Sequence, residues 1–585
     1  MRYPQLKVQA TNKQMVDAFR GYNHNLRIND GEFFDMKNMT SDYYPVLSPR
    51  GKRGFYVKPA SPQGMIAKDA ICYVDGGEFV VGDYRVAMGL STAPEDCPKQ
   101  LISMGAYVII MPDKKYINTI DLTDFGDIEA SFNTQDDVTF EMCSLTGDVY
   151  SGAVASPTAP SNPKNMDLWI DTSSEPHALK RYYEAGATWV IVATTYVRIS
   201  SPGLGKAFKQ YDGVTISGIT SEKIVGLNGT ASLWGCGDDY IIVVGILDAV
   251  VTQTAVEGRI TIERRMPTMD YVIESGNRLW GCRYGVALNG EVVNEIYASK
   301  LGDFRNWSCF MGLSTDSYVA SCGTDGQFTG AITHLGYPLF FKENCVHKVY
   351  GSYPANFQIQ DTACRGVQKG CHNSLAIVNE TLFYKARSGI CAFDGSLPTE
   401  ASYALGNEAY SDAVGGAHAN KYYVSMKDVE GNWHLFVYDT AKSMWHKEDN
   451  LHASAFCSYR GEMYCIDADA RNIITMLGSG TEDTGEVEWM VETGELGISS
   501  PDMKYISRIT VRMSMEVGAK AELYAQYDMS DEWVHVCTIF STDLRSFSIP
   551  IRPRRCDHMK LRIAGKGMAK IYAITKTIEQ GSDLS

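Results

Sequence analysis

The segment Leu339-Phe340-Phe341-Lys342 runs, after a short turn, into Val349-Tyr350-Gly351-Ser352. The same pattern recurs as Leu382-Phe383-Tyr384-Lys385, which runs into Phe393-Asp394-Gly395-Ser396. The offset is 43 residues at the start (382 − 339) and 44 at the end (393 − 349), so one turn has grown by one residue. A period of about 40–45 residues made of short strands is typical of a β-propeller, in which each repeat forms one four-stranded blade.

Two weaker copies of this pattern follow further along the chain. Tyr422-Tyr423-Val424-Ser425 leads to Val437-Tyr438-Asp439, and Met463-Tyr464-Cys465-Ile466 leads to Ile473-Ile474. The repetition therefore predicts several consecutive blades.

One of these repeats has the layout of a kelch-type blade. Gly415 and Gly416 precede its aromatic strand, and a glycine pair lets strands crowd the propeller axis. Trp445 follows near the end of the repeat. We expect this side chain to be buried between neighbouring blades.

Length and composition describe an ordinary globular protein of several domains. The chain has 585 residues, 44% of them apolar and 21% charged, which excludes disorder and collagen-like structure. Its net charge of −15, from 69 acidic and 54 basic residues, argues against a protein that grips nucleic acid, because phosphates are bound by clustered Lys and Arg. A channel through which DNA slides remains compatible with this charge.

Composition and spacing divide the chain into five parts. Residues 1–60 show few strand signals and are predicted to be an arm that is ordered by docking. Residues 61–124 begin the propeller, and residues 271–490 complete it. Residues 125–270 lose the propeller spacing and are assigned to one or two small all-β modules inserted in a propeller loop. Residues 491–585 have strands at about ten-residue spacing, which is typical of a β-sandwich.

The predicted fold class is therefore all-β, a β-propeller with inserted small β modules and a C-terminal β-sandwich. Residues 13–19 are the one candidate helix. Residues 1–12 have no apolar core, which argues against a secretion signal. No stretch reaches the roughly 18 apolar residues of a membrane span, and residues 240–251 are predicted to be buried strands.

The fifteen cysteines are scattered and include no CxxC pair. A disulfide framework or a zinc site would show regular close spacing. We predict reduced core thiols, in a protein folded in a cytosol, and no metal site.

No pattern of catalytic residues emerges from the sequence. Glycoside hydrolysis needs two carboxylates at one pocket, whereas Asp394, Asp439 and Asp467 stand at similar places in successive repeats, which favours a turn role. Sialidase-type Ser-x-Asp-x-Gly-x-x-Trp boxes, phosphate loops, GxSxG elbows and HExxH motifs are absent. We therefore predict that the chain is not an enzyme and needs no cofactor.

The densest positive patch is Arg552-Pro553-Arg554-Arg555. Arg552, Arg554 and Arg555 are candidate contacts with an acidic partner subunit or with DNA. The alternative interpretation is a solvated corner between two strands.

Aromatic residues of the insert form a second candidate site. Trp169, Tyr182 and Trp189 are candidate contacts with a glycan, because flat rings stack on sugars. The alternative interpretation is the small core of a module that has little else to bury.

Three short motifs then occur in a familiar order. Asn277-Arg278-Leu279-Trp280, Ile296-Tyr297-Ala298-Ser299 and the run from Gly302 to Trp307 resemble a segment of bacteriophage tail nozzle proteins. These proteins are also called tail tubular protein B or packaged-DNA stabilisation proteins.

The predicted arm is similar to the N-terminal arm of that family. The similarity rests on Asn25-Leu26-Arg27, Gly31-Glu32, Asn38 and Leu47-Ser48-Pro49-Arg50-Gly51. In the family a similar run ends in a Leu-x-x-Arg-x-Gly type of turn, whereas Gly51 here follows Arg50 directly.

The resemblance implies a virion structural protein, located in the tail and made in the host cytoplasm. Such a chain would form a ring-shaped nozzle or hub, a hexamer in the family, that serves DNA retention and ejection. The implied partners are further copies of the chain, portal, adaptor and other tail proteins, and DNA that passes without sequence recognition. Two alternatives stay open: a propeller-based receptor- or carbohydrate-binding tail component, and a tail-associated glycan-degrading enzyme.

Overall fold

The structure is a computed structural model that describes residues 11–91, 99–173, 175–287, 290–480, 485–498, 503–528 and 530–580. The outermost residues of the predicted arm and sandwich, 1–10 and 581–585, lie outside these ranges. The chain forms two compact units. One consists of Met1–Lys99, Phe340–Val346 and Thr362–Ser585, and the other of Gln100–Leu339 and His347–Asp361.

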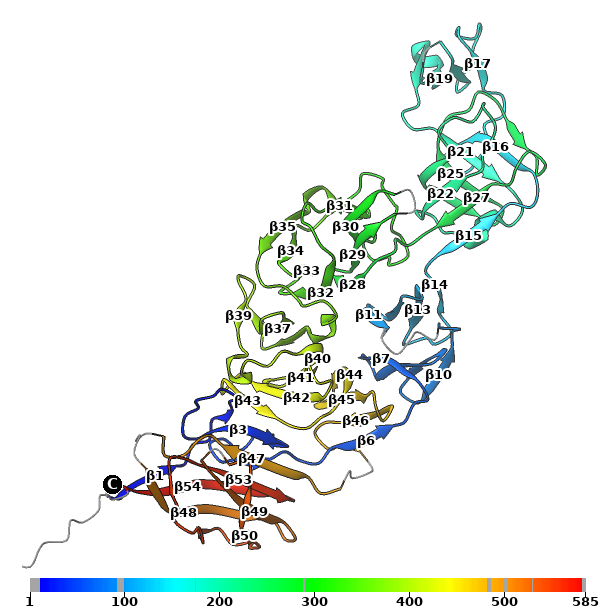
Figure 1. Cartoon of the computed structure of the whole chain (residues 1–585). Coiled ribbons are helices and arrows are strands. Elements are labelled where there is room, and N and C mark those ends of the chain that lie inside the picture. Colours follow the sequence, from blue (N-terminus) through cyan, green and yellow to red (C-terminus); the bar gives the residue numbers. More distant parts are fainter. Residues whose placement is uncertain are drawn as a thin grey trace, which may run out of the picture. The chain divides into compact units, whose positions relative to one another are not determined.

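The fold is all-β, a β-propeller with inserted small β modules and a C-terminal β-sandwich, so the predicted fold class is confirmed (Figure 1). Helical structure in the described ranges is confined to short 3-10 turns: η1 (Glu184–Gly186), η2 (Leu204–Ala207), η3 (Pro354–Asn356), η4 (His372–Ser374) and η5 (Tyr403–Leu405).

Seven groups of four strands of blade type are present in the described part of the chain; six are separate four-stranded sheets, and the strands β40 to β43 belong to a ten-stranded sheet. The first three are β7 (Pro62–Ala67), β8 (Ile71–Asp75), β9 (Glu78–Val81) and β10 (Tyr84–Ala87); β11 (Gln100–Met104), β12 (Tyr107–Met111), β13 (Lys115–Asn118) and β14 (Phe125–Asp127); and β28 (Tyr271–Ser275), β29 (Arg278–Val286), β30 (Val292–Ala298) and β31 (Tyr318–Ser321).

The next three blades are β32 (Phe328–His334), β33 (Tyr337–Lys342), β34 (Cys345–Tyr350) and β35 (Gln358–Ala363); β36 (Ala376–Val378), β37 (Thr381–Ala386), β38 (Gly389–Phe393) and β39 (Thr399–Glu400); and β40 (Ser411–His418), β41 (Lys421–Lys427), β42 (Trp433–Asp439) and β43 (Met444–Lys447). The duplicated sequence pattern occupies β33 and β34 in one blade and β37 and β38 in the next. The repeat thus marks equivalent strands, as predicted.

The glycine pair of the kelch-like blade lies where strands crowd. A Cβ on Gly415 would lie 2.5 Å from the Ser374 carbonyl oxygen, and one on Gly416 would lie 2.5 Å from the Phe456 Cβ of the following blade. Trp445 is 2% exposed, and its indole Nε1 donates to the Ala401 carbonyl at 2.7 Å. Both kelch-type expectations are therefore confirmed.

The seventh blade is assembled from two distant parts of the chain. Strands β44 (Ala453–Tyr459), β45 (Glu462–Asp467) and β46 (Asn472–Thr475) come from residues after 450, and β6 (Gly54–Val57) is the fourth strand. In the antiparallel pairing of β46 with β6, Ile474 lies opposite Phe55. The N-terminal segment therefore supplies the fourth strand, β6, of the seventh blade.

An ion-pair cluster holds this segment in place. The buried Arg53 guanidinium lies 2.7 Å from Glu448 Oε2 and 2.7 Å from Asp449 Oδ2, and Arg50 Nη2 lies 3.2 Å from the same Asp449 oxygen. Burial would raise the pKa of Asp449, but the charges of Arg53 and Arg50 outweigh it and hold the pKa below its usual range. Removing one member would leave the others buried without full compensation.

The C-terminal sandwich also takes in N-terminal strands (Figure 1). One sheet is β1 (Thr11–Val16), β54 (Ala569–Gln580), β48 (Lys504–Met515) and β51 (Arg545–Ile549), with β52 (Arg555–Cys556) paired to β48. The other continues from β43 through β2 (Gly21–Tyr22), β3 (Glu32–Lys37), β47 (Glu488–Thr493), β53 (Met559–Lys566), β49 (Lys520–Tyr527) and β50 (Val534–Ile539). A small sheet pairs β4 (Met39–Thr40) with β5 (Ser48–Pro49).

The expected helix at residues 13–19 is wrong. Lys13 and Val16 lie in β1 and pair with Thr577 and Ile574 of β54. Pairing along an available sheet edge overrides weak local helix propensity.

The insert consists of three sheets that contribute to one core, which includes Phe140, Val197 and Ile262 and, from the third sheet, Ile170 and Leu179. The first is β15 (Ala130–Asn133), β27 (Thr261–Arg264), β22 (Gly213–Ser217) and β23 (Gly229–Ser232), and the second is β24 (Gly235–Gly237), β25 (Tyr240–Val244), β21 (Tyr196–Ser200), β16 (Val138–Cys143) and β26 (Val251–Gln253).

The third sheet of the insert is formed by a segment inserted between β16 and β21. It contains β17 (Val154–Ser156), β18 (Leu168–Asp171), β19 (Ala178–Tyr183) and β20 (Thr188–Ile191). Cys143 of β16 and Tyr196 of β21 are paired, so residues 144–195 leave and re-enter the insert at neighbouring points. We call residues 144–195 the tip module.

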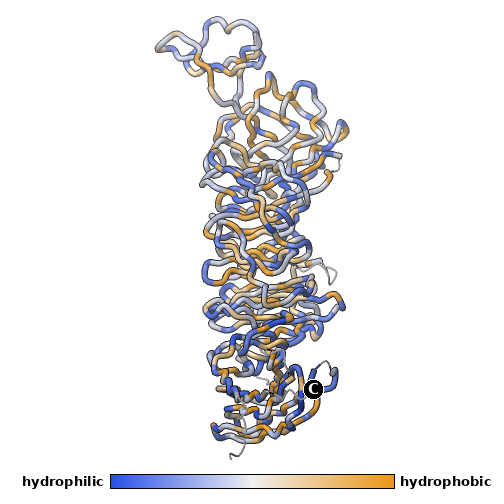
Figure 2. Tube along the Cα trace, turned by 60° about the vertical axis from the view of Figure 1, so that its left-hand side comes forward, coloured by the Kyte–Doolittle hydropathy of each residue, from blue (hydrophilic) through white to orange (hydrophobic). Residues whose placement is uncertain are grey.

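Hydrophobic and hydrophilic residues alternate over short distances along the trace (Figure 2). Among the described residues no helix is long and apolar enough to cross a membrane. The cysteines of the same ranges are free thiols, and most are buried, in agreement with the prediction of core thiols.

The buried His446 makes the stability of this unit depend on pH. Burial lowers its pKa to about 3, below the ordinary value of about 6.5. A group whose pKa is lower in the folded state stabilises the protein above the unfolded pKa, and this contribution is lost as pH falls from about 6.5 toward 3. The expected slope is up to about 1.4 kcal/mol per pH unit.

Denaturant titrations from pH 7 to pH 4 measure this slope. We expect His446→Gln to flatten the pH dependence of the free energy of unfolding, and His418→Gln on the surface to leave it unchanged. Equal slopes in wild type and His446→Gln would contradict the prediction.

Candidate functional site

The aromatic residues of the tip module are only partly accessible. Trp169 is 6% exposed, and its Nε1 donates to the Ser156 carbonyl at 2.9 Å. Trp189 packs edge-on against Trp169, with ring centroids 5.5 Å apart, and is tilted by 56° from the Tyr182 ring. Trp169 therefore lies in the core of the module, while Tyr182 and Trp189 are half-buried and do not form one flat surface.

The three arginines of the basic patch are all exposed. Arg552 and Arg554 lie in the loop before β52, and Arg555 begins that strand. The Arg554 guanidinium lies over the Tyr527 ring at 5.3 Å, and the Tyr527 hydroxyl donates to the Arg552 carbonyl at 3.4 Å. The loop thus presents its charges to solvent around one aromatic ring.

The recurring aspartates are turn residues. Asp439 Oδ1 accepts the Ala441 and Lys442 amides at 3.1 Å, and Asp467 Oδ1 accepts the Asp469 and Ala470 amides at 3.0 Å. Asp394 Oδ1 accepts the Ser396 amide in the same way. Asp394 follows the third strand of its blade and Asp439 ends the third strand of its blade, whereas Asp467 ends the second strand of its blade, so the predicted equivalence holds for two of the three.

A polar groove of about 740 Å³ lies beside the start of the insert. Two of its carboxylates are ion-paired as follows: Lys114 Nζ lies 2.7 Å from Glu129, and Arg265 lies 2.6 Å from Glu263. Groups of this kind can bind sugar hydroxyls. No group of three or more His, Cys, Asp or Glu side chains suited to a metal ion occurs among the described residues.

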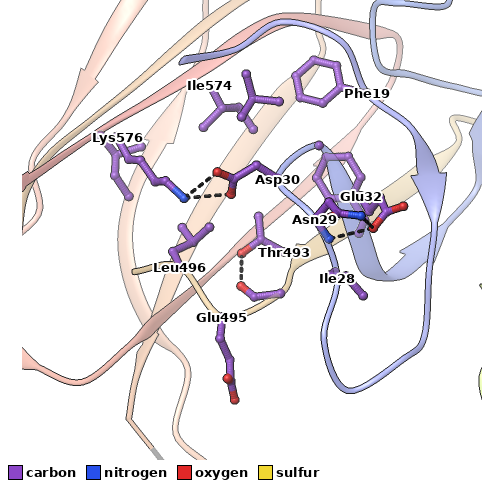
Figure 3. A pocket seen from close by; sticks show the side chains of 15 residues that line it. Phe19, Ile28, Asn29, Asp30, Glu32, Thr493, Glu495, Leu496, Ile574 and Lys576 are labelled. Atoms are coloured by element: carbon purple, nitrogen blue, oxygen red, sulfur yellow. Dashed lines mark hydrogen bonds and ion pairs between the residues drawn. The ribbon is translucent and has the colours of Figure 1, made fainter. Parts of the chain in front are cut away.

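A smaller cavity of about 40 Å³ lies between the arm and the sandwich (Figure 3). Phe19, Ile574 and Leu496 contribute apolar walls, and Lys576 Nζ binds both carboxylate oxygens of Asp30 at 2.7 and 3.0 Å. The volume suits a single water rather than a ligand. This cavity is therefore a feature of arm docking.

The motif from Gly302 to Trp307 joins the insert to its blade. Asn306 Nδ2 donates to Asp212 at 3.0 Å, and Asn306 Oδ1 accepts the Gly213 amide at 2.9 Å. The buried Asp212 carboxylate also receives Arg264 Nη1 at 2.6 Å. One buried carboxylate thus holds β22, β27 and the blade loop together.

Other buried motif residues also connect parts of the fold. Arg278 is 2% exposed, and its guanidinium donates to the Ser299 and Ser314 carbonyls at 2.8 Å. Asn38 Nδ2 donates to the Glu488 carbonyl at 2.7 Å. Leu26, in contrast, is 95% exposed.

No protein-family model and no curated protein matches the chain. Solved structures do match it. An exo-β-1,3-galactanase from Phanerochaete chrysosporium is 9% identical, with 52% of this chain and 94% of that chain covered and a TM-score of 0.20. A Trypanosoma rangeli sialidase is 8% identical, with 97% and 96% covered and a TM-score of 0.23. At these values the likeness concerns the propeller fold alone.

These neighbours correct one prediction. Both are glycoside hydrolases, which contradicts the prediction that the chain is not an enzyme, and that prediction is withdrawn.

The role of the buried Asp212 carboxylate, which contacts Arg264 and Asn306, can be tested directly. Asp212→Asn leaves Arg264 buried without its countercharge, which we expect to lower the free energy of unfolding of the insert by about 3–5 kcal/mol. Glu263→Gln, which removes the partner of the 70% exposed Arg265, is the matched control and should cost less than about 1 kcal/mol. Denaturant unfolding followed by hydrogen exchange measures both, and similar costs would contradict the role of the joint.

Proposed function

We propose that the chain is a structural subunit of a ring-shaped phage tail nozzle or hub, which forms part of the channel for DNA retention and ejection. The proposal starts from the resemblance in the arm and in the blade that carries the insert. The residues of that resemblance act as joints in this fold, as Asn38, Arg278 and Asn306 illustrate. The net charge of −15 is compatible with a channel that DNA crosses without being held.

The exposure of Leu26 is the observation that best supports assembly into a ring. It belongs to the arm motif Asn25-Leu26-Arg27, yet its side chain is almost fully in solvent. Burying a leucine yields about 1.5–3 kcal/mol, which a contact with a neighbouring subunit would recover. The arm is fastened to the sandwich and to the seventh blade, so this loop is held in a defined position for such a contact.

The oligomeric state of the purified chain and its presence in virions together test the proposal. We expect the purified chain to form rings in mass photometry, and the protein to be present in purified virions. Leu26→Ser should weaken ring assembly at least about tenfold without changing thermal stability. Val256→Ser, at a residue that is 98% exposed in the insert, is the matched control and should assemble normally. A monomer at all concentrations that is also absent from virions would refute the proposal.

A second candidate function is recognition of a glycan or another surface receptor by the insert. The tip module exposes several apolar side chains: Leu145, Val154, Met166, Tyr183, Val190 and Ile191. Such a concentration of exposed apolar residues is typical of an interaction surface. The open polar groove near Glu129 and Glu263 is a further place for a glycan.

Binding of the full-length chain to host cell envelopes tests this second function. We expect the double change Tyr183→Ser with Ile191→Ser to reduce binding at least about tenfold, while Val225→Ser, at an 82% exposed control position, leaves it unchanged. Equal binding by all variants would exclude the tip module as the receptor site.

A further inference from the structure

One face of the sandwich sheet formed by β1, β54, β48 and β51 is basic. On β48 the side chains of Ile509, Val511 and Met513 are buried, whereas Arg508 and Arg512 are exposed on the opposite side. The alternation of a strand thus directs both arginines to the same outer face.

Neighbouring strands add further basic residues to this face. Thr577 of β54 is paired with Lys13 on one side and with Arg508 on the other. Arg555 of β52 lies opposite Tyr505 of β48. We call Lys13, Arg508, Arg512 and Arg555 the basic face.

In the described part of the chain, the side chains of the basic face form no ion pair. Within the described ranges no carboxylate lies within ion-pair distance of these four side chains, and Arg508 Nε donates to the Ser548 hydroxyl at 3.2 Å. Glu579 is the one acidic residue that the described parts of these five strands contain. A cluster of positive charge therefore stands out in a chain whose net charge is −15.

The remaining side chains of this face point to the kind of partner. They are chiefly hydroxyls: Thr510, Ser514, Ser546, Ser548, Thr575 and Thr577. Met15, at 64% exposure, is the one exposed large aliphatic residue among the described residues of these strands. The centre of a protein–protein interface is typically apolar and aromatic, whereas Arg, Lys, Ser and Thr are the side chains that contact DNA phosphates.

We propose that the basic face binds the phosphate backbone of duplex DNA without sequence recognition. Arginine and lysine neutralise phosphates, and the intervening hydroxyls donate hydrogen bonds to phosphate oxygens. Arg552 and Arg554, which precede Arg555 in the exposed loop, extend the positive charge at one edge. The inference deepens the retention role of the proposed function, on which it rests for the presence of DNA, but the contact requires no ring and is therefore tested on the purified chain.

Fluorescence anisotropy of a labelled random-sequence duplex with the full-length chain tests the inference across salt concentrations. We expect binding that weakens with salt. Because each phosphate contact contributes about 0.9 to the slope of log K against log salt, Arg508→Gln with Arg512→Gln should reduce the slope by about 1.8. The matched control, Lys520→Gln with Lys566→Gln, removes the same charge from β49 and β53 of the other sheet and should leave the slope unchanged.

Three results would overturn the inference. They are an absence of binding at low salt, an equal loss of slope in both double variants, and tight binding of soluble polyglutamate where DNA does not bind. The last result would identify the face as a contact for an acidic protein. Thermal unfolding of each variant confirms that it is folded. The double variant Lys13→Gln with Arg555→Gln removes the other two charges of the basic face and serves as a second test.

Discussion

The pairing of β6 with β46 is the constraint on which one unit of this protein depends. Three strands of the seventh blade come from residues 453–475 and the fourth from Gly54–Val57, so the blade is complete only when distant parts of the chain meet. Arg53, immediately before β6, is buried against Glu448 and Asp449, which makes the junction an ion-paired one. A buried arginine between two carboxylates favours this position of the segment, since moving the segment away would leave buried charges unpaired.

The same principle governs the insert. Asp212 is buried where two strands of the insert meet a blade loop, and its carboxylate is shared by Arg264 and Asn306. A long loop insertion needs such a point of attachment if it is to act as a defined part of the fold. The tip module, which begins and ends at a paired position of β16 and β21, is nested within the insert in turn.

Two of these contacts involve residues of the motifs that resemble phage tail nozzle proteins, namely Arg50 beside Asp449 and Asn306 beside Asp212. The resemblance therefore concerns contacts that hold the fold together, whereas interactions with other molecules would use exposed surfaces. Leu26 on the arm, the apolar residues of the tip module and the basic face are three separate surfaces of this kind. A propeller scaffold by itself does not specify the site that is built on it.

The sequence by itself determined the blades, because a strand pattern repeated every 43 or 44 residues reports local spacing. Gly415, Gly416 and Trp445 were also predictable, since their residue types meet a packing requirement of every kelch-like blade. The sequence misled at residues 13–19, where a sheet edge made available by β54 decides the conformation. The burial of Trp169 agrees with the alternative interpretation of the tip aromatics as the small core of a module. Only the tertiary structure decided that β6 completes the seventh blade and that Arg264 meets Asp212. Likewise, Lys13, Arg508, Arg512 and Arg555 form one face only after pairing, because strand register brings together residues that lie hundreds of positions apart.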